Sequence, residues 1–112
     1  MAAPPKPPSA PPANNRIQDR HDRKLRVFFT YDGVEKDGIS KNISLGGMYV
    51  VTPDPPPFGV SVMLRFKLPT YKEESRVKAS VRWVDAEGMG VQFGTLRAIE
   101  VWALNQYFKQ ED

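Results

Sequence analysis

The residues with the most evident chemistry are a polar pair and two glycines in the segment Asn42–Gly47. Asn42 and Ser44 are two residues apart, and such positions in an extended segment face the same side. An amide and a hydroxyl would then donate and accept hydrogen bonds at one place. The glycines that follow allow a sharp change of backbone direction. The pattern predicts either a polar binding surface or a strand that ends in a Gly-Gly turn, with Asn and Ser selected by the turn.

A second group of candidate residues is formed by Arg16, Arg20 and Arg23. Residues 1–26 contain six basic and two acidic side chains, a charge of +4, whereas the whole chain carries +3. Guanidinium groups bind phosphate through two parallel hydrogen bonds, stack on purines and donate to the O6/N7 edge of guanine. A basic arm beside a nearly neutral domain indicates an anionic partner. The alternative is an arm of solvated charges without a ligand.

Composition excludes several classes of protein. The 112 residues suffice for one domain with a modest core. The sequence has no cysteine and a single histidine, His21, which excludes disulfides, thiolate catalysis and multi-histidine metal sites. No apolar run approaches the ~20 residues of a membrane span. No nucleophile–base pair is evident either, so we expect a cytoplasmic protein that is not an enzyme and has no metal or other cofactor.

The chain divides into three parts by composition. Residues 1–13 contain six prolines with alanine and serine, which predicts a disordered, polyproline-like tail. Residues 14–26 are polar and rich in arginine, without an apolar face, and predict a flexible basic arm that becomes ordered only against an anion or a neighbouring surface. Residues 25–109 predict the folded domain.

The folded part shows strand patterns followed by one helix pattern. Apolar and polar residues alternate in several short runs, Asp32-Gly33 predicts a hairpin turn, and the second run predicts a strand at a sheet edge. Thr95 is a candidate N-cap for a helix with a wide apolar arc, which would cover one end or face of the sheet. Trp83 and Trp102 are expected in the core or between sheet and helix. Strands are expected over residues 25–31, 34–44, 48–52, 60–68, 76–83 and 89–93, and the helix over 96–109.

These elements predict a mostly β protein, a six-stranded antiparallel β-barrel with a C-terminal α-helix. Together with this predicted fold, the sequence motifs indicate a protein family. The arginine-rich segment, then Asn-x-Ser-x-x-Gly at Asn42, Ser44 and Gly47, then Arg82-Trp83-Val84 and Gly88–Phe93, resemble the PilZ domain. The resemblance runs from about residue 16 to residue 108. The family's first signature, Arg-x-x-x-Arg, matches in spacing at residues 16–20.

The resemblance implies a bacterial receptor for cyclic di-GMP. In that reading the nucleotide is bound by Arg16, Arg20, Arg23, Asn42, Ser44 and Gly47. The ligand would order the arm against the turn and thereby change contacts with a protein partner.

Two alternatives remain open. A barrel of this type that does not bind the nucleotide would act by docking to a protein through its tail, an edge strand or the helix. Nucleic-acid binding by the basic arm is less favoured, since the strands give no evident aromatic platform and the positive charge is confined to one segment.

Overall fold

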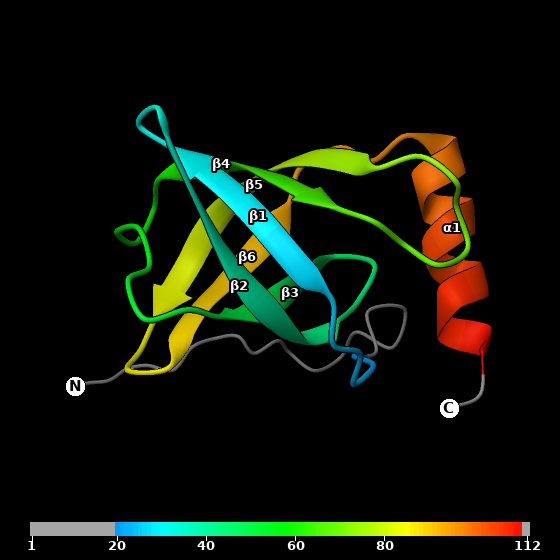
Figure 1. The fold of residues 1–112 in the computed structure, drawn as a ribbon, viewed down its shortest axis with the longest axis horizontal. Coiled ribbons are helices and arrows are strands. Elements are labelled where there is room, and N and C mark those ends of the chain that lie inside the picture. Colours follow the sequence, from blue (N-terminus) through cyan, green and yellow to red (C-terminus); the bar gives the residue numbers. More distant parts are fainter. Residues whose placement is uncertain (1–19, 111–112) are drawn as a thin grey trace.

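The computed structural model describes residues 20–110, which fold into a closed barrel with one helix (Figure 1). All neighbouring strands are antiparallel, and the order around the barrel is β1-β2-β3-β6-β5-β4. The predicted six-stranded barrel with a C-terminal helix is therefore confirmed. The predicted tail and the first part of the arm, Arg16 included, lie outside the described residues. The elements are β1 (Arg26–Tyr31), β2 (Val34–Ile43), β3 (Gly47–Val51), β4 (Ser61–Phe66), β5 (Ser75–Val84), β6 (Gly88–Phe93) and α1 (Ala98–Lys109).

The core fills the inside of the barrel with one face of every strand. In β4 and β5 burial alternates residue by residue, as the period-two pattern of these strands predicts. Burial of apolar side chains contributes roughly 25 cal/mol per Å² and is the main force that holds the strands together. The largest fully buried side chains are Phe29, Ile43, Met48, Leu64, Leu68, Met89 and Leu104.

The hairpin between β1 and β2 has the predicted two-residue turn. Asp32 and Gly33 have φ angles of 54° and 79°, and Tyr31 pairs with Val34 across the turn. Two left-handed residues in a row match the twist of the flanking strands, and Asp-Gly adopts them at low cost. The turn fixes the register of the whole hairpin.

The prediction that β2 lies at a sheet edge is wrong, because β2 pairs with both β1 and β3. Its polar sequence has another cause. Most of its side chains face solvent, and only Ser40 and Ile43, near its end, are buried. A register shift between Ser40 and Asn42 marks a bulge, which re-aims the side chains that follow.

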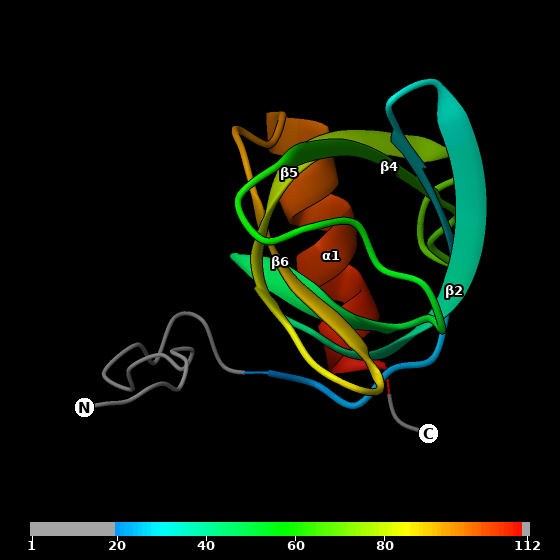
Figure 2. The same ribbon diagram turned by 90° about the vertical axis from the view of Figure 1, so that its left-hand side faces the viewer.

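The helix begins later than predicted. It starts at Ala98, because Glu100 reaches back to accept a hydrogen bond of 3.0 Å from the backbone N–H of Arg97. Thr95, the predicted N-cap, has no acidic residue three positions later to do the same. Figure 2 looks along the barrel and shows α1 across its far end. The buried face of α1 consists of Glu100, Ala103, Leu104 and Tyr107.

The opposite face of α1 is exposed. The side chain of Trp102 is 51 % exposed and that of Ile99 is 39 % exposed. The expectation that Trp102 packs in the core or between sheet and helix is therefore wrong. The helix turns these two apolar side chains away from the barrel and leaves an apolar surface on α1.

Candidate functional site

The described part of the basic arm, from Arg20 onward, runs against the end of β2. His21 and Ile43 exchange two backbone hydrogen bonds of 2.8 and 2.9 Å, which form an isolated antiparallel bridge. The bridge places Arg20 next to Asn42, and Nη1 of Arg20 donates a hydrogen bond of 2.7 Å to Oδ1 of Asn42. Two candidate residues that lie 22 positions apart in the sequence are therefore in direct contact.

The Arg20–Asn42 pair lies at the surface and keeps hydrogen-bonding capacity. Arg20 is exposed and Asn42 is half-buried. Partial burial of the guanidinium lowers the pKa of Arg20, but an arginine remains charged at neutral pH. No described residue accepts a hydrogen bond from the amide nitrogen of Asn42. The pair therefore presents a cation and a hydrogen-bond donor side by side.

Ser44 is engaged inside the turn that follows β2. It is only 2 % exposed. Its hydroxyl accepts a hydrogen bond of 3.1 Å from the N–H of Gly46, and its own N–H donates to the carbonyl of Gly47 at 2.8 Å. The expectation that Asn42 and Ser44 present their side chains together at the surface is not met, because Ser44 is buried. Its role as a ligand residue stays a prediction.

Gly47 allows two strands to pass closely. It opens β3 and pairs with Gln92 of β6. A Cβ atom at this position would lie 2.1 Å from the carbonyl oxygen of Val91, a distance that no side chain tolerates. The close packing of β3 and β6 therefore explains why position 47 is glycine, whether or not a ligand binds there.

Arg23 is directed toward the helix. Its Nη2 donates hydrogen bonds to the carbonyls of Phe108 and Gln110 at 3.3 and 3.0 Å, and its guanidinium lies 5.4 Å from the ring centroid of Tyr107. Helix C-termini carry unpaired carbonyls and a partial negative charge, which a guanidinium satisfies. The structure thus brings Arg20 and Asn42 together and places Arg23 at the end of α1.

Sequence reasoning missed an aromatic surface beside this pair. Asn42, Tyr49, Gly90 and Trp83 are successive cross-strand partners on β2, β3, β6 and β5. The rings of Tyr49 and Trp83 lie 6.2 Å apart, and a Cβ atom on Gly90 would lie 2.8 Å from the Trp83 ring. The indole therefore covers the backbone of β6 on the outside of the barrel. We call these four residues the outer row.

The position of Trp83 corrects the expectation that it packs in the core or between sheet and helix. It is half-buried on the outside of the barrel and is not part of the core. The reason is a register shift between Val81 and Trp83, where β5 has a bulge. Without the bulge, strict alternation would turn Trp83 inward with Val81, which is fully buried. The signal in the sequence is Gly90 in the next strand, which leaves room for a large ring.

Tyr49 is fixed within the outer row. Its hydroxyl donates a hydrogen bond to Oδ1 of Asp85, which also accepts from the N–H groups of Glu87 and Gly88 at 2.9 and 3.0 Å. Burial and the neighbouring Asp85 raise the pKa of Tyr49, and the hydrogen bond from Tyr49 lowers the pKa of Asp85. The Nζ of Lys41 lies 5.8 Å from the Tyr49 ring. At neutral pH the ring is uncharged and held in place.

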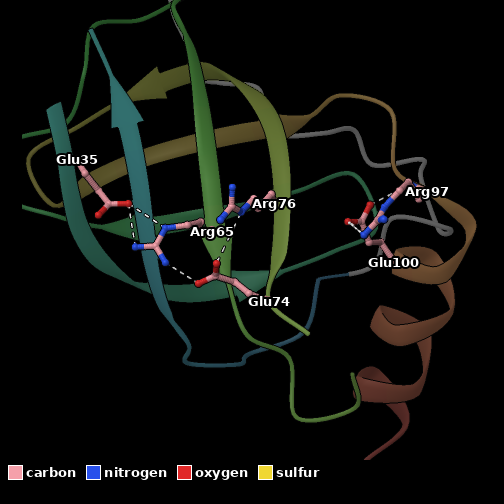
Figure 3. A network of polar contacts seen from close by, with 6 residues as sticks. All are labelled: Glu35, Arg65, Glu74, Arg76, Arg97 and Glu100. Atoms are coloured by element: carbon pink, nitrogen blue, oxygen red, sulfur yellow. Dashed lines mark hydrogen bonds and ion pairs between the residues drawn. The ribbon is translucent and has the colours of Figure 1, made fainter. Parts of the chain in front are cut away.

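Ion pairs link basic side chains of β4 and β5 to neighbouring glutamates (Figure 3). Arg65 contacts Glu35 at 2.9 Å and Glu74 at 2.6 Å, and Arg76 lies 3.8 Å from Glu74. The guanidinium of Arg65 also lies 4.5 Å from the Phe28 ring centroid. These exposed pairs form a polar sheet face, and each contributes little to stability.

Two further properties concern only the part of the chain between residues 20 and 110. It contains no cluster of histidine and acidic side chains that could hold a metal ion. None of its helices is long and apolar enough to cross a membrane.

The comparisons with known proteins agree on one family. A family model of the PilZ domain matches residues 14–110. The structure of the Bacillus subtilis inhibitor of motility, MotI/DgrA, is similar with 30% identity and a TM-score of 0.68, over 90% of this chain and 54% of that chain. The chain thus spans about half the length of MotI. No curated protein sequence gives a significant match.

Two more distant structures share the fold. The PilZ domain of CeSA from a cellulose synthesizing bacterium has 17% identity and a TM-score of 0.63, over 80% of this chain and 94% of that chain. Borreliella burgdorferi PlzA, solved in complex with c-di-GMP, has 17% identity and a TM-score of 0.67, over 86% of this chain and 42% of that chain. At this level of identity the two structures bear on the fold alone.

Proposed function

The chain belongs to the PilZ domain family, and from this premise we propose that it is a cytoplasmic receptor for cyclic di-GMP that changes its contacts with a protein partner. The observation that carries the proposal is the hydrogen bond between Arg20 and Asn42, which joins the two signatures of the family at one place. PlzA, a structural neighbour, was solved with this nucleotide bound. The matched family model describes a PilZ domain, and a structural neighbour with this fold holds a nucleotide, which supports a binding role.

The chemistry of the site fits a cyclic dinucleotide, which carries two phosphates and two guanines. The guanidinium of Arg20 would bind a phosphate or the O6/N7 edge of a guanine. The amide nitrogen of Asn42, which donates to no residue within 20–110, would donate to the same ligand. The half-buried indole of Trp83, in the outer row, would offer a face on which a base stacks, whereas Tyr49 is only 7 % exposed and packs beside it. Arg16, four residues before Arg20, is proposed as the second arginine of the arm.

The remaining candidate residues are proposed to position the site. Arg23 fastens the arm to α1 through the carbonyls of Phe108 and Gln110. Ser44 and Gly47 set the turn that follows Asn42. Substitution of Arg23, Ser44 or Gly47 would weaken nucleotide binding indirectly, by loosening the arm or the turn.

The output is proposed to pass through the helix. The segment that carries Arg20 also contacts the end of α1, so a ligand that draws Arg20 away from Asn42 would disturb that contact. Ile99 and Trp102, exposed on α1, provide an apolar surface for a protein partner. The same two residues favour the second candidate function, a docking protein that does not bind the nucleotide.

Calorimetric titration with cyclic di-GMP tests the proposal. The matched pair of variants is Arg20→Ala and Arg26→Ala, because Arg26 is also an exposed arginine and pairs with Asp37 across the hairpin. Saturable binding by the parent and by Arg26→Ala, with loss in Arg20→Ala, would support the site. Equal binding by all three proteins would place the site elsewhere. If the parent does not bind the nucleotide, the second candidate function, a docking protein, would be favoured.

A further inference from the structure

A pocket that the nucleotide proposal does not use opens at the end of the barrel opposite α1. Its volume is about 280 Å³. The hairpin turn of β1 and β2 and the segment after β3 form its walls, and both lie far from the helix (Figure 1). The lining residues are Phe29, Tyr31, Asp32, Val34, Lys36, Asp54 and Pro55–Pro57.

The walls combine aromatic rings, prolines and carboxylates. Tyr31 and Val34 face three consecutive prolines, and rings beside flat apolar surfaces are what proline-rich segments bind. Lys36 is paired with Asp54, while Asp32 has no ion pair with any residue in the range 20–110. The rim therefore carries a net negative charge. This pocket suits a proline-rich segment with a positive charge.

The chain itself contains such a segment. Residues 4–8 read Pro-Pro-Lys-Pro-Pro, and Lys6 is the only charged side chain within residues 1–13. We infer that this proline-rich segment docks in the pocket of its own chain, with Lys6 at Asp32. The segment lies outside the described residues. The inference therefore rests on the chemistry of the pocket and on whether the chain between Lys6 and Arg20 is long enough to reach it.

The chain between Lys6 and Arg20 is long enough to reach the pocket. Arg20 is held beside Asn42, near the end of β2, whereas Val34 and Lys36 of the pocket lie at the start of the same strand. Nine residues of strand separate Val34 from Ile43, roughly 30 Å. Fourteen residues separate Lys6 from Arg20, and a proline-rich chain spans about 3.1 Å per residue, roughly 43 Å in total. The segment can therefore reach the pocket with several residues to spare.

A spin label on the tail tests the inference in the full chain. The natural sequence has no cysteine, so Ser9→Cys gives one labelling site. With the label active, the amide NMR signals of Tyr31, Asp32 and Val34 should fall about two-fold or more, because a tethered segment has a high effective concentration at its site. Asn105 on α1, at the opposite end of the barrel, should keep its intensity. Absent or evenly spread broadening would overturn the inference.

Two variants and one mixture sharpen the test. Val34→Lys adds a repelling charge to the exposed rim and should remove the broadening, whereas Ile39→Lys, on the same strand and similarly exposed but outside the pocket, should not. Lys6→Glu should reduce it as well. In a mixture of labelled chains with unlabelled, isotope-enriched chains, broadening at the same amides would mean docking onto a second copy. That result would overturn docking within one chain.

Discussion

The imidazole ring of His21 lies flat against the ring of Phe108, with centroids 4.1 Å apart and planes inclined by 11°. Two residues later, Arg23 hydrogen-bonds the last carbonyls of α1. The hydroxyl of Ser40 holds the same segment from the barrel, donating to the carbonyl of Arg23 and accepting from the N–H of Leu25. The arm, the end of β2 and the end of the helix therefore form one connected unit.

Arg23→Ala should lower the free energy of unfolding by about 1–2 kcal/mol, because two carbonyls at the end of α1 lose a charged donor. Urea denaturation followed by circular dichroism measures the loss. Arg82→Ala is the control, since Arg82 is an exposed arginine that makes no ion pair within the described range.

The same variant separates positioning from ligand contact. Arg23→Ala should weaken cyclic di-GMP binding less than Arg20→Ala does. An equal or larger loss of affinity, without a loss of stability, would instead make Arg23 a ligand residue.

Arg20→Lys should keep the charge and still weaken nucleotide binding by about ten-fold or more, because lysine lacks the planar fork that matches phosphate and guanine. The thermal midpoint should stay close to that of the parent, since Arg20 is exposed. Calorimetry and a melting curve on the same sample give both values. Parent-like affinity in Arg20→Lys would mean that the site reads charge alone.

Gly47→Ala should cost about 3 kcal/mol or more, because the new Cβ meets the carbonyl of Val91 and has to push β3 from β6. Gly33→Asn is the matched control. Its site is open and has a φ of 79°, which asparagine adopts in such a turn, so the cost should stay below about 1 kcal/mol. If Gly47→Ala has the same urea midpoint of unfolding as the parent, the inferred close contact between β3 and β6 is wrong.

Binding of the nucleotide should change the fluorescence of Trp83 more than that of Trp102. Trp83 stands in the outer row, whereas Trp102 is on the exposed face of α1. Trp102→Phe should therefore keep most of the signal change, and Trp83→Phe should lose most of it. A change that survives only in Trp83→Phe would place the response at the helix.

Asp85 should stabilise the fold at neutral pH and lose this effect in acid. Its pKa is lowered by the hydrogen bond from Tyr49, so its contribution is present above the ordinary aspartate pKa of about 3.9 and is lost as the pH falls through the lower, folded value. In Tyr49→Phe the pKa of Asp85 should rise. A carbon NMR titration of the Asp85 carboxyl in both proteins checks this, and equal pKa values would contradict it.

The alternation of apolar residues was enough to predict the barrel, since most inward positions of β4 and β5 follow period two. The pattern fails where a bulge intervenes. Trp83 changes faces because β5 gains a residue at that point, and neither the bulge nor its partner Gly90 is visible in the alternation. Bulges depend on pairing between strands, which the sequence of one strand does not contain.

The candidate site was predictable in its parts but not in its contacts. Arg20 and Asn42 carry recognisable chemistry, yet their meeting depends on the backbone bridge between His21 and Ile43, a long-range pairing. Arg23 has the same residue type as Arg20 and a different environment, because alternation along the arm turns it toward α1. Residue type and spacing gave equal weight to Arg16, Arg20 and Arg23.

Closure of the barrel has a consequence for how a partner can bind. Each of the six strands already has two hydrogen-bonded neighbours. Some stretches, residues 34–38 of β2 among them, pair on one side alone. A partner peptide therefore has only short segments to extend by β-augmentation, a mode in which main-chain hydrogen bonds supply affinity with little regard to sequence. Recognition of this barrel depends mainly on side chains, which makes it sensitive to single substitutions on the surface of the partner.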